Sequence, residues 1–171
     1  MNDESKIDIN KLLIKPVYIG LFMNILVPAI LLGIVYYIDK NGGQGRGLTS
    51  DTYNIMFWAL CVVAISEGAM AFILRQKFFF SPMAVSKETL EDDLVRGFMN
   101  ASIICYAFTS AIAIYGLILF FMGGTFETMV LFVLISMIAY QFIRPRYGFA
   151  KKVIEAQEKF VQEGHFYQPK K

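Results

Sequence analysis

The chain has 171 residues and a mass of 19.4 kDa, with 56% hydrophobic and only 18% charged residues and a net charge of +2. Soluble domains contain on average about 45–50% hydrophobic residues and about 25% charged residues. Together with the mean hydropathy of +0.51, this composition argues against a disordered chain and against a soluble globular enzyme. Two cysteines are too few for a disulfide-rich secreted scaffold.

Four apolar stretches predict four membrane-spanning helices, at residues 17–38, 53–74, 98–122 and 126–143. A helix needs about 20 apolar residues to cross the hydrocarbon core. Acidic residues precede the first stretch and no small-residue cleavage site follows it, so we interpret it as a retained helix. The chain then divides into an N-terminal segment (1–16), a four-span bundle (17–143) and a C-terminal segment (144–171).

The basic residues predict the orientation of these spans. Fourteen of the sixteen Lys and Arg residues lie before the first span, between the second and third, or after the fourth; Lys40 and Arg46 are the exceptions. The positive-inside rule therefore places both termini and the middle loop in the cytoplasm, as in a multi-pass protein of the cell (inner) membrane. The Gly-rich loop at 41–47 and a tight Gly123–Gly124 turn then face outward.

The middle loop contains two recognisable patterns. Ser86 is a candidate N-cap for a helix that runs through Arg96 into the third span, with acidic residues in its first turn. Phe78–Phe80 follow Arg75 and Lys77, and such aromatic and basic residues are typical of the lipid headgroup region. A binding patch for a partner is the alternative for these aromatic residues.

The C-terminal segment predicts an amphipathic helix. Pro145 lies between Arg144 and Arg146, where it can end one helix and start another. From Tyr147 to Glu163 apolar residues recur at helical spacing, so we expect this helix to lie on the inner leaflet or against the middle loop, or to dock a soluble partner. Arg75, Lys77, Arg144 and Arg146 are the predicted lipid-interface residues. His165 is the only histidine, so no histidine cluster can bind a metal or haem.

Glu67 is the one acidic residue well inside a predicted span. It lies eight residues before Arg75, or about 12 Å from the boundary by helical rise. Asn24, Tyr106 and Ser136 lie at similar depth, and Pro28 cannot donate to the carbonyl of Asn24. These residues predict a polar layer in which a protonated Glu67 donates to that carbonyl. The layer either ties the helices together or forms a site for protons or cations.

Small residues predict where the second and third spans approach each other. Ala64 and Gly68 are four residues apart, as are Ala107 and Ala111. This spacing places each pair on one helix face, where small side chains allow close packing.

The second and third spans resemble the helical hairpin of the proteolipid c subunit of rotary ATP synthases. The resemblance rests on Gly68–Gln76 (GAMAFILRQ) and Ser110–Ile118 (SAIAIYGLI). It implies a hairpin with a cytoplasmic Arg-Gln loop that packs into an oligomer. Ser110 stands where that family has its ion-carrying carboxylate, and the family's repeated Gly-x-Gly pattern is missing. The family's ion site is therefore not carried over.

These observations predict an all-α fold, a four-helix transmembrane bundle with a C-terminal cytoplasmic amphipathic helix. We expect a non-enzymatic membrane protein that works as a homo-oligomer or as a small accessory subunit. The alternative is a proton or cation channel or carrier that uses Glu67. No catalytic set, metal site or cofactor is expected. The expected partners are membrane lipid and either the chain itself or another membrane protein; because topology explains the basic residues, no nucleic acid is expected.

Overall fold

The computed structural model describes residues 7–42 and 47–167. Within this part of the chain the fold is all-α, 82% helical and without strands. Four helices are long and apolar enough to cross a membrane: Ile9–Lys40, Ser50–Phe79, Leu90–Phe121 and Phe126–Ile143. Each contains nearly all of one predicted apolar stretch, so the all-α class and the number of candidate spans are confirmed.

The first long helix changes its winding halfway along. It consists of α1 (Ile9–Leu21), the π-helical turn η1 (Phe22–Leu26) and α2 (Val27–Lys40). The amide of Val27 donates to the carbonyl of Phe22, five residues back. Pro28 follows directly and has no amide hydrogen to donate. The interruption expected at Pro28 thus takes the form of a π-helical turn, a feature that is often found at functional sites.

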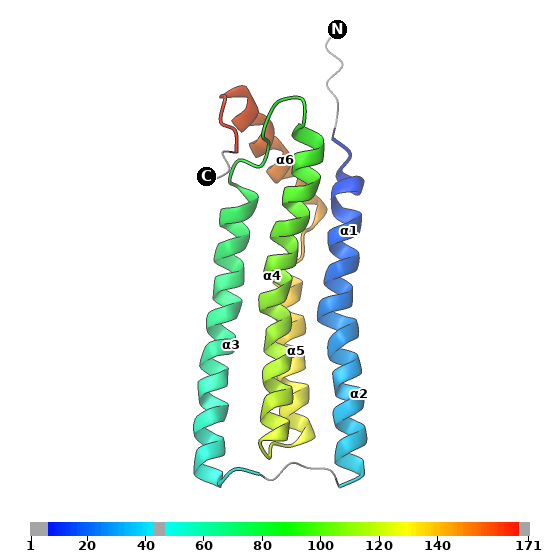
Figure 1. Ribbon diagram of the computed structural model, residues 1–171, viewed down its shortest axis with the longest axis vertical. Helices are drawn as coiled ribbons and strands as arrows, with labels where there is room; N and C mark the ends of the chain where they lie inside the picture. Colours follow the sequence, from blue (N-terminus) through cyan, green and yellow to red (C-terminus); the bar gives the residue numbers. More distant parts are fainter. Residues whose placement is uncertain (1–6, 43–46, 168–171) are drawn as a thin grey trace.

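α4 (Leu90–Phe121) is the central helix of the bundle. In the apolar window of this helix 44% of the residues are buried, compared with 33% for α5 (Phe126–Ile143), 17% for the first long helix and 11% for α3 (Ser50–Phe79). Figure 1 shows α4 and α5 together in the middle, with α1 and α2 on one side and α3 on the other. At Gly116 an added Cβ would lie 2.8 Å from Cβ of Phe132, so a glycine is needed where α4 meets α5.

The turn between α4 and α5 also depends on glycine. Gly123 has a φ of +103°, and a Cβ there would lie 2.5 Å from Cα of Gly47. The amide of Leu48 donates to the carbonyl of Met122 over 3.0 Å. These contacts join the turn to the segment that precedes α3. The predicted Gly123–Gly124 turn is therefore confirmed.

A last helix, α6 (Tyr147–Gln162), lies across one end of the bundle. The break predicted at Pro145 is present, because α5 ends at Ile143 and α6 begins at Tyr147. Figure 1 shows α6 at the same end as the start of α1 and the connection between α3 and α4; we call this the α6 end. Ala150, Val153 and Ile154 of α6 are buried there against the cluster that contains Phe79 and Phe98.

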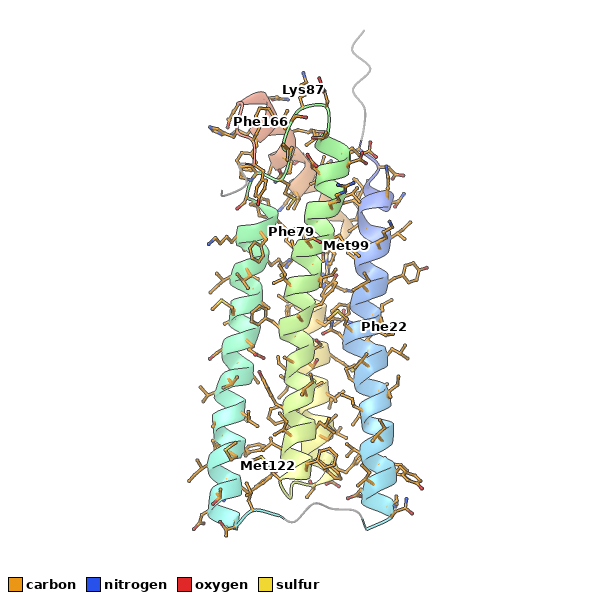
Figure 2. All side chains as sticks on the ribbon, in the orientation of Figure 1. Phe22, Phe79, Lys87, Met99, Met122 and Phe166 are labelled. Atoms are coloured by element: carbon orange, nitrogen blue, oxygen red, sulfur yellow. The ribbon has the colours of Figure 1, made fainter. Side chains whose placement is uncertain are left out.

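The connection between α3 and α4 is ordered mainly by the carboxylate of Asp93, with a longer hydrogen bond from the amide of Thr89 to the hydroxyl oxygen of Ser86 (3.3 Å). Asp93 accepts hydrogen bonds from the amide of Val85 (2.9 Å) and from the hydroxyl of Thr89 (2.6 Å). α4 begins at Leu90 and not after Ser86, so the N-cap prediction is wrong: the residues after Ser86 form this Asp93-bound loop. α4 then continues without a break to Phe121, as expected. Lys87, labelled in Figure 2, lies at the tip of this connection.

Candidate functional site in the bundle interior

Three buried polar side chains join three helices near the middle of the bundle. The hydroxyl of Thr109 on α4 donates to Oδ1 of Asn24 over 2.7 Å. The hydroxyl of Ser136 on α5 donates to the carbonyl of Thr109, also over 2.7 Å. Nδ2 of Asn24 donates to the carbonyl of Gly20 over 3.3 Å. Asn24 lies within the π-helical turn, so this turn delivers its amide to α4.

The predicted layer correctly grouped Asn24 and Ser136 but did not include Thr109, which bridges them. All three side chains are fully buried or nearly so. The sequence does contain an indication that Thr109 belongs to this layer: it lies three residues after Tyr106 and so shares its helix face. An unpaired polar group in this apolar interior would cost free energy. The two hydrogen bonds between helices, Thr109 to Asn24 and Ser136 to Thr109, therefore fix the register of the first long helix, α4 and α5.

Tyr106 is buried as expected but does not bind Asn24. Its ring packs edge-on against Tyr140, with centroids 5.5 Å apart. A Cβ at Gly20 would lie 2.8 Å from the hydroxyl of Tyr140 and 2.9 Å from Cζ of Tyr106. Both phenol rings therefore pack directly against the backbone of α1 at Gly20, where a larger residue would clash. Neither hydroxyl has a hydrogen-bond partner among the residues that the structure describes.

Glu67 lies on the other side of α4, in contact with a residue that the sequence did not indicate. The hydroxyl of Tyr115 donates to Oε1 of Glu67 over 2.5 Å. Oε2 of Glu67 is buried and has no hydrogen-bond partner within residues 7–42 and 47–167. The structure therefore does not bring Glu67 to the carbonyl of Asn24, because α4 stands between α1 and α3.

The depth of a residue in the membrane, estimated by counting residues along the helix, does not indicate that Tyr115 contacts Glu67. The thiol of Cys105 lies 3.7 Å from the carbonyl of Ala71, which sets the levels of the two antiparallel helices. Glu67 is then level with Thr109, and Tyr115 is six residues further along, or roughly 9 Å by helical rise. Side chains on a helix point toward its N-terminus, so the long tyrosine reaches back toward Glu67.

The four small residues proposed for close packing have different surroundings. Ala64 is buried in a cluster with Ile112, Leu119 and Phe132. Gly68 has open space beside it, since an added Cβ would meet nothing within 4 Å. Ala107 is exposed and Ala111 is half-buried. The contact between α3 and α4 therefore uses Ala64, whereas Gly68 is half-buried and leaves open space beside that contact.

Arg75, one of the predicted lipid-interface residues, contributes to packing at the α6 end. Its guanidinium carbon lies 3.9 Å from the ring centroid of Phe149, and Nη1 donates to the carbonyl of Phe142 over 2.9 Å. Arg75 thereby ties α3 to α5 and α6. Arg144 is half-buried, whereas Lys77 and Arg146 are exposed.

The aromatic run beside Arg75 is also part of the internal packing. The ring of Phe79 lies 4.6 Å from that of Phe98 and 5.2 Å from that of Phe149, measured between centroids. Only 2% of Phe79 is exposed, so the prediction that this run lies among lipid headgroups is wrong for Phe79. Helix α6 covers it instead.

Within the described part of the chain, no group of three or more His, Cys, Asp or Glu side chains is arranged to hold a metal ion. Cys61 and Cys105 are free thiols. His165 lies beside Glu163, with 3.5 Å between Nδ1 and a carboxylate oxygen.

No protein-family model matches this chain, and neither a curated protein nor a solved structure is significantly similar to it.

Proposed function

We propose that this protein is a non-enzymatic integral membrane protein that associates within the membrane, either with itself or as a small accessory subunit, through α3. The observation that carries the proposal is the one-sided packing of α3. Only 11% of its apolar window is buried, and it packs mainly on α4. Lipid can cover apolar side chains such as Ile65 and Trp58, so exposure alone does not define an interface.

Gly68, which is half-buried at the edge of the exposed surface of α3, is what favours close association with another helix. Because Gly68 has no side chain and an added Cβ would meet nothing within 4 Å, the surface of α3 is recessed at this position, near the middle of the helix. Small residues at such positions allow the backbones of two helices to approach and pack. The resemblance of this hairpin to the proteolipid c subunit, which packs into rings, supports the same proposal.

The test is a native mass measurement in nanodiscs or mild detergent. Gly68→Leu should shift the assembly toward the monomer without unfolding it, because the monomer has space for the larger side chain. Gly33→Leu on α2 is the matched control, since Gly33 is also open, and it should leave the assembly unchanged. A wild-type protein that is strictly monomeric and has no stoichiometric membrane partner would contradict the proposal.

We further propose that the α6 end is cytoplasmic and that the protein lies in the inner membrane. The start of α1, the connection between α3 and α4, and α6 all lie at this end (Figure 1). These segments carry most of the basic residues, which the positive-inside rule assigns to the cytoplasm.

A proton or cation carrier is the second candidate, and a single observation favours it. Oε2 of Glu67 is buried without a hydrogen-bond partner among the described residues, while Oε1 is bound by Tyr115. Placing an acidic group inside a membrane-spanning helix costs free energy, and such groups often have a function. A free acceptor oxygen is what a transferred proton or cation would bind.

A further inference from the structure

A basic pocket lies between α1 and α4 at the α6 end. Its volume is about 150 Å³. Three cationic side chains surround a floor of apolar side chains, and the lining residues are Lys11, Leu12, Lys15, Pro16, Val95, Arg96 and Met99. No carboxylate lines it. The pocket is at the level where the apolar part of both helices begins, which is the level of lipid headgroups.

Two of the three cations in this pocket are available to a ligand. Lys11 is paired with Glu91 at 2.6 Å. Neither Lys15 nor Arg96 forms an ion pair in the part of the chain that the structure describes. The nearest acid to Arg96 along α4, Asp93, is engaged by Val85 and Thr89. Lys15 and Arg96 therefore present positive charge beside the apolar floor without a direct ion pair among the described residues, although the carboxylate of Asp93 lies close enough to Arg96 to attract it.

A second, apolar pocket lies between the first long helix and α4, further along both helices from the α6 end. Its volume is about 100 Å³, and its lining residues are Met23, Val27, Pro28, Leu31, Ser110, Ala113 and Ile114. Val95 in the first pocket and Ala113 in the second are eighteen residues apart, which is five helical turns, so they lie on one face of α4. The π-helical turn η1 contributes Met23 to the second pocket.

The spacing of the two pockets matches the shape of a phospholipid. Lys15 and Val27 are twelve residues apart, or roughly 18 Å along the helix axis. Half of a hydrocarbon core is about 15 Å thick. A lipid with its phosphate at the basic pocket would therefore place the distal part of an acyl chain at the apolar pocket.

We propose that the two pockets together bind one anionic phospholipid, with its phosphate between Lys15 and Arg96 and one acyl chain running over the surface of α4 to the pocket at Pro28. Arginine can offer two parallel N–H donors to phosphate oxygens, and lysine adds a compact charge. The apolar floor formed by Leu12 and Met99 suits the glycerol and upper acyl region. The inference rests on the four long helices crossing a bilayer, and not on the proposed self-association.

The first test compares two lipids by native mass spectrometry of the detergent-solubilised protein. The probes are phosphatidylglycerol and phosphatidylcholine with identical acyl chains. We expect a stoichiometric phosphatidylglycerol adduct, and the double variant Lys15→Gln/Arg96→Gln should weaken it about tenfold or more, since each cation near a membrane surface contributes substantially to anionic lipid binding. The control is Lys151→Gln/Lys152→Gln on exposed positions of α6, which should bind as the wild type does. Equal binding of the two lipids, or an equal loss in both double variants, would overturn the proposal.

The second test concerns the acyl chain and separates a lipid from a free phosphate ester. Ser110→Leu should fill the deeper pocket and weaken long-chain phosphatidylglycerol while leaving dihexanoyl phosphatidylglycerol unaffected; Ile114→Phe is a second variant with the same expectation. Soluble glycerol phosphate should not displace the long-chain lipid. Displacement by glycerol phosphate would identify the site as one for the phosphate group alone, and unchanged long-chain binding in folded versions of both variants would contradict the acyl path.

Discussion

The hydroxyl of Tyr115 donates a 2.5 Å hydrogen bond to Oε1 of Glu67 and so links α4 to α3 inside the apolar zone. α3 packs mainly on α4, which makes this contact one of the few polar links that hold α3 in place. The second carboxylate oxygen of Glu67, Oε2, has no hydrogen-bond partner among the described residues. The pair therefore bears on both proposed functions.

Replacing Glu67 by Gln separates the two candidate functions. The amide oxygen of Gln can still accept the hydrogen bond from Tyr115, so the free energy of unfolding should change little. Glu67→Leu should destabilise the protein by about 1–3 kcal/mol, because it leaves the Tyr115 hydroxyl unpaired. Thermal unfolding in detergent measures both changes. In proteoliposomes, a pH-dependent proton flux that is present in the wild type and absent from Glu67→Gln would favour the carrier over the non-transporting protein.

The hydrogen bond between Thr109 and Asn24 should contribute measurably to stability. Thr109→Val keeps the shape of the side chain but removes the donor, and we expect a loss of about 1 kcal/mol, within the range of polar contacts between membrane helices. The double variant with Asn24→Leu should be less destabilised than the sum of the single variants, because both remove the same bond. Ser66→Ala is the control, since its hydroxyl binds only the carbonyl of Val62 within α3. Strict additivity of the two changes would mean that the bond contributes nothing.

Gln157 should hold α6 onto the bundle. Its amide donates to the carbonyls of Phe79 (3.3 Å) and Ser81 (2.8 Å), and its oxygen accepts from the amide of Met83 (2.9 Å). Gln157→Leu leaves these backbone groups unpaired, at about 1–3 kcal/mol for each buried group. Limited trypsin digestion should then cleave at Lys151 and Lys152 several-fold faster. Gln162→Leu, at an exposed position, should digest at the wild-type rate.

The proposed orientation can be tested by cysteine labelling from one side of the membrane. Cys61 and Cys105 are first replaced by Ala. A thiol reagent that cannot cross the membrane should then label Asp51→Cys, at the end opposite α6, and should not label Lys87→Cys until the membrane is permeabilised. Both positions are exposed in the fold, so burial cannot account for a difference. The reverse labelling pattern would place the α6 end outside.

The number of long helices could be predicted from the sequence because it depends only on apolar length. The helix ends could not be predicted as well. α3 extends from Ser50 to Phe79, beyond the apolar stretch at 53–74, because helical hydrogen bonding does not stop where polar side chains begin. The break at Pro145 was predictable since proline has no amide hydrogen to donate.

The depth of the candidate site residues in the membrane could be predicted from the sequence, but the neighbouring helix that each side chain faces could not. Residue counting placed Glu67, Asn24 and Ser136 at similar levels, and the levels agree with the helix contacts. Which face each residue occupies depends on the order of the helices around α4, which no local pattern contains. Pro28 indicated a disturbed helix, yet the π-helical turn that aims Asn24 at Thr109 arises from tertiary packing and the missing donor together.

The position of α6 has a consequence for the order in which the chain assembles during synthesis. Gln157 binds backbone carbonyls that were translated 78 and 76 residues earlier. Until the ribosome has delivered Gln157, Phe79 lacks the helix that covers it and the turn after α3 lacks its hydrogen-bond donors. One end of the bundle therefore stays unfinished until α6 has been translated, and a nascent chain arrested just after Ile143 should expose this aromatic surface to chaperones and proteases.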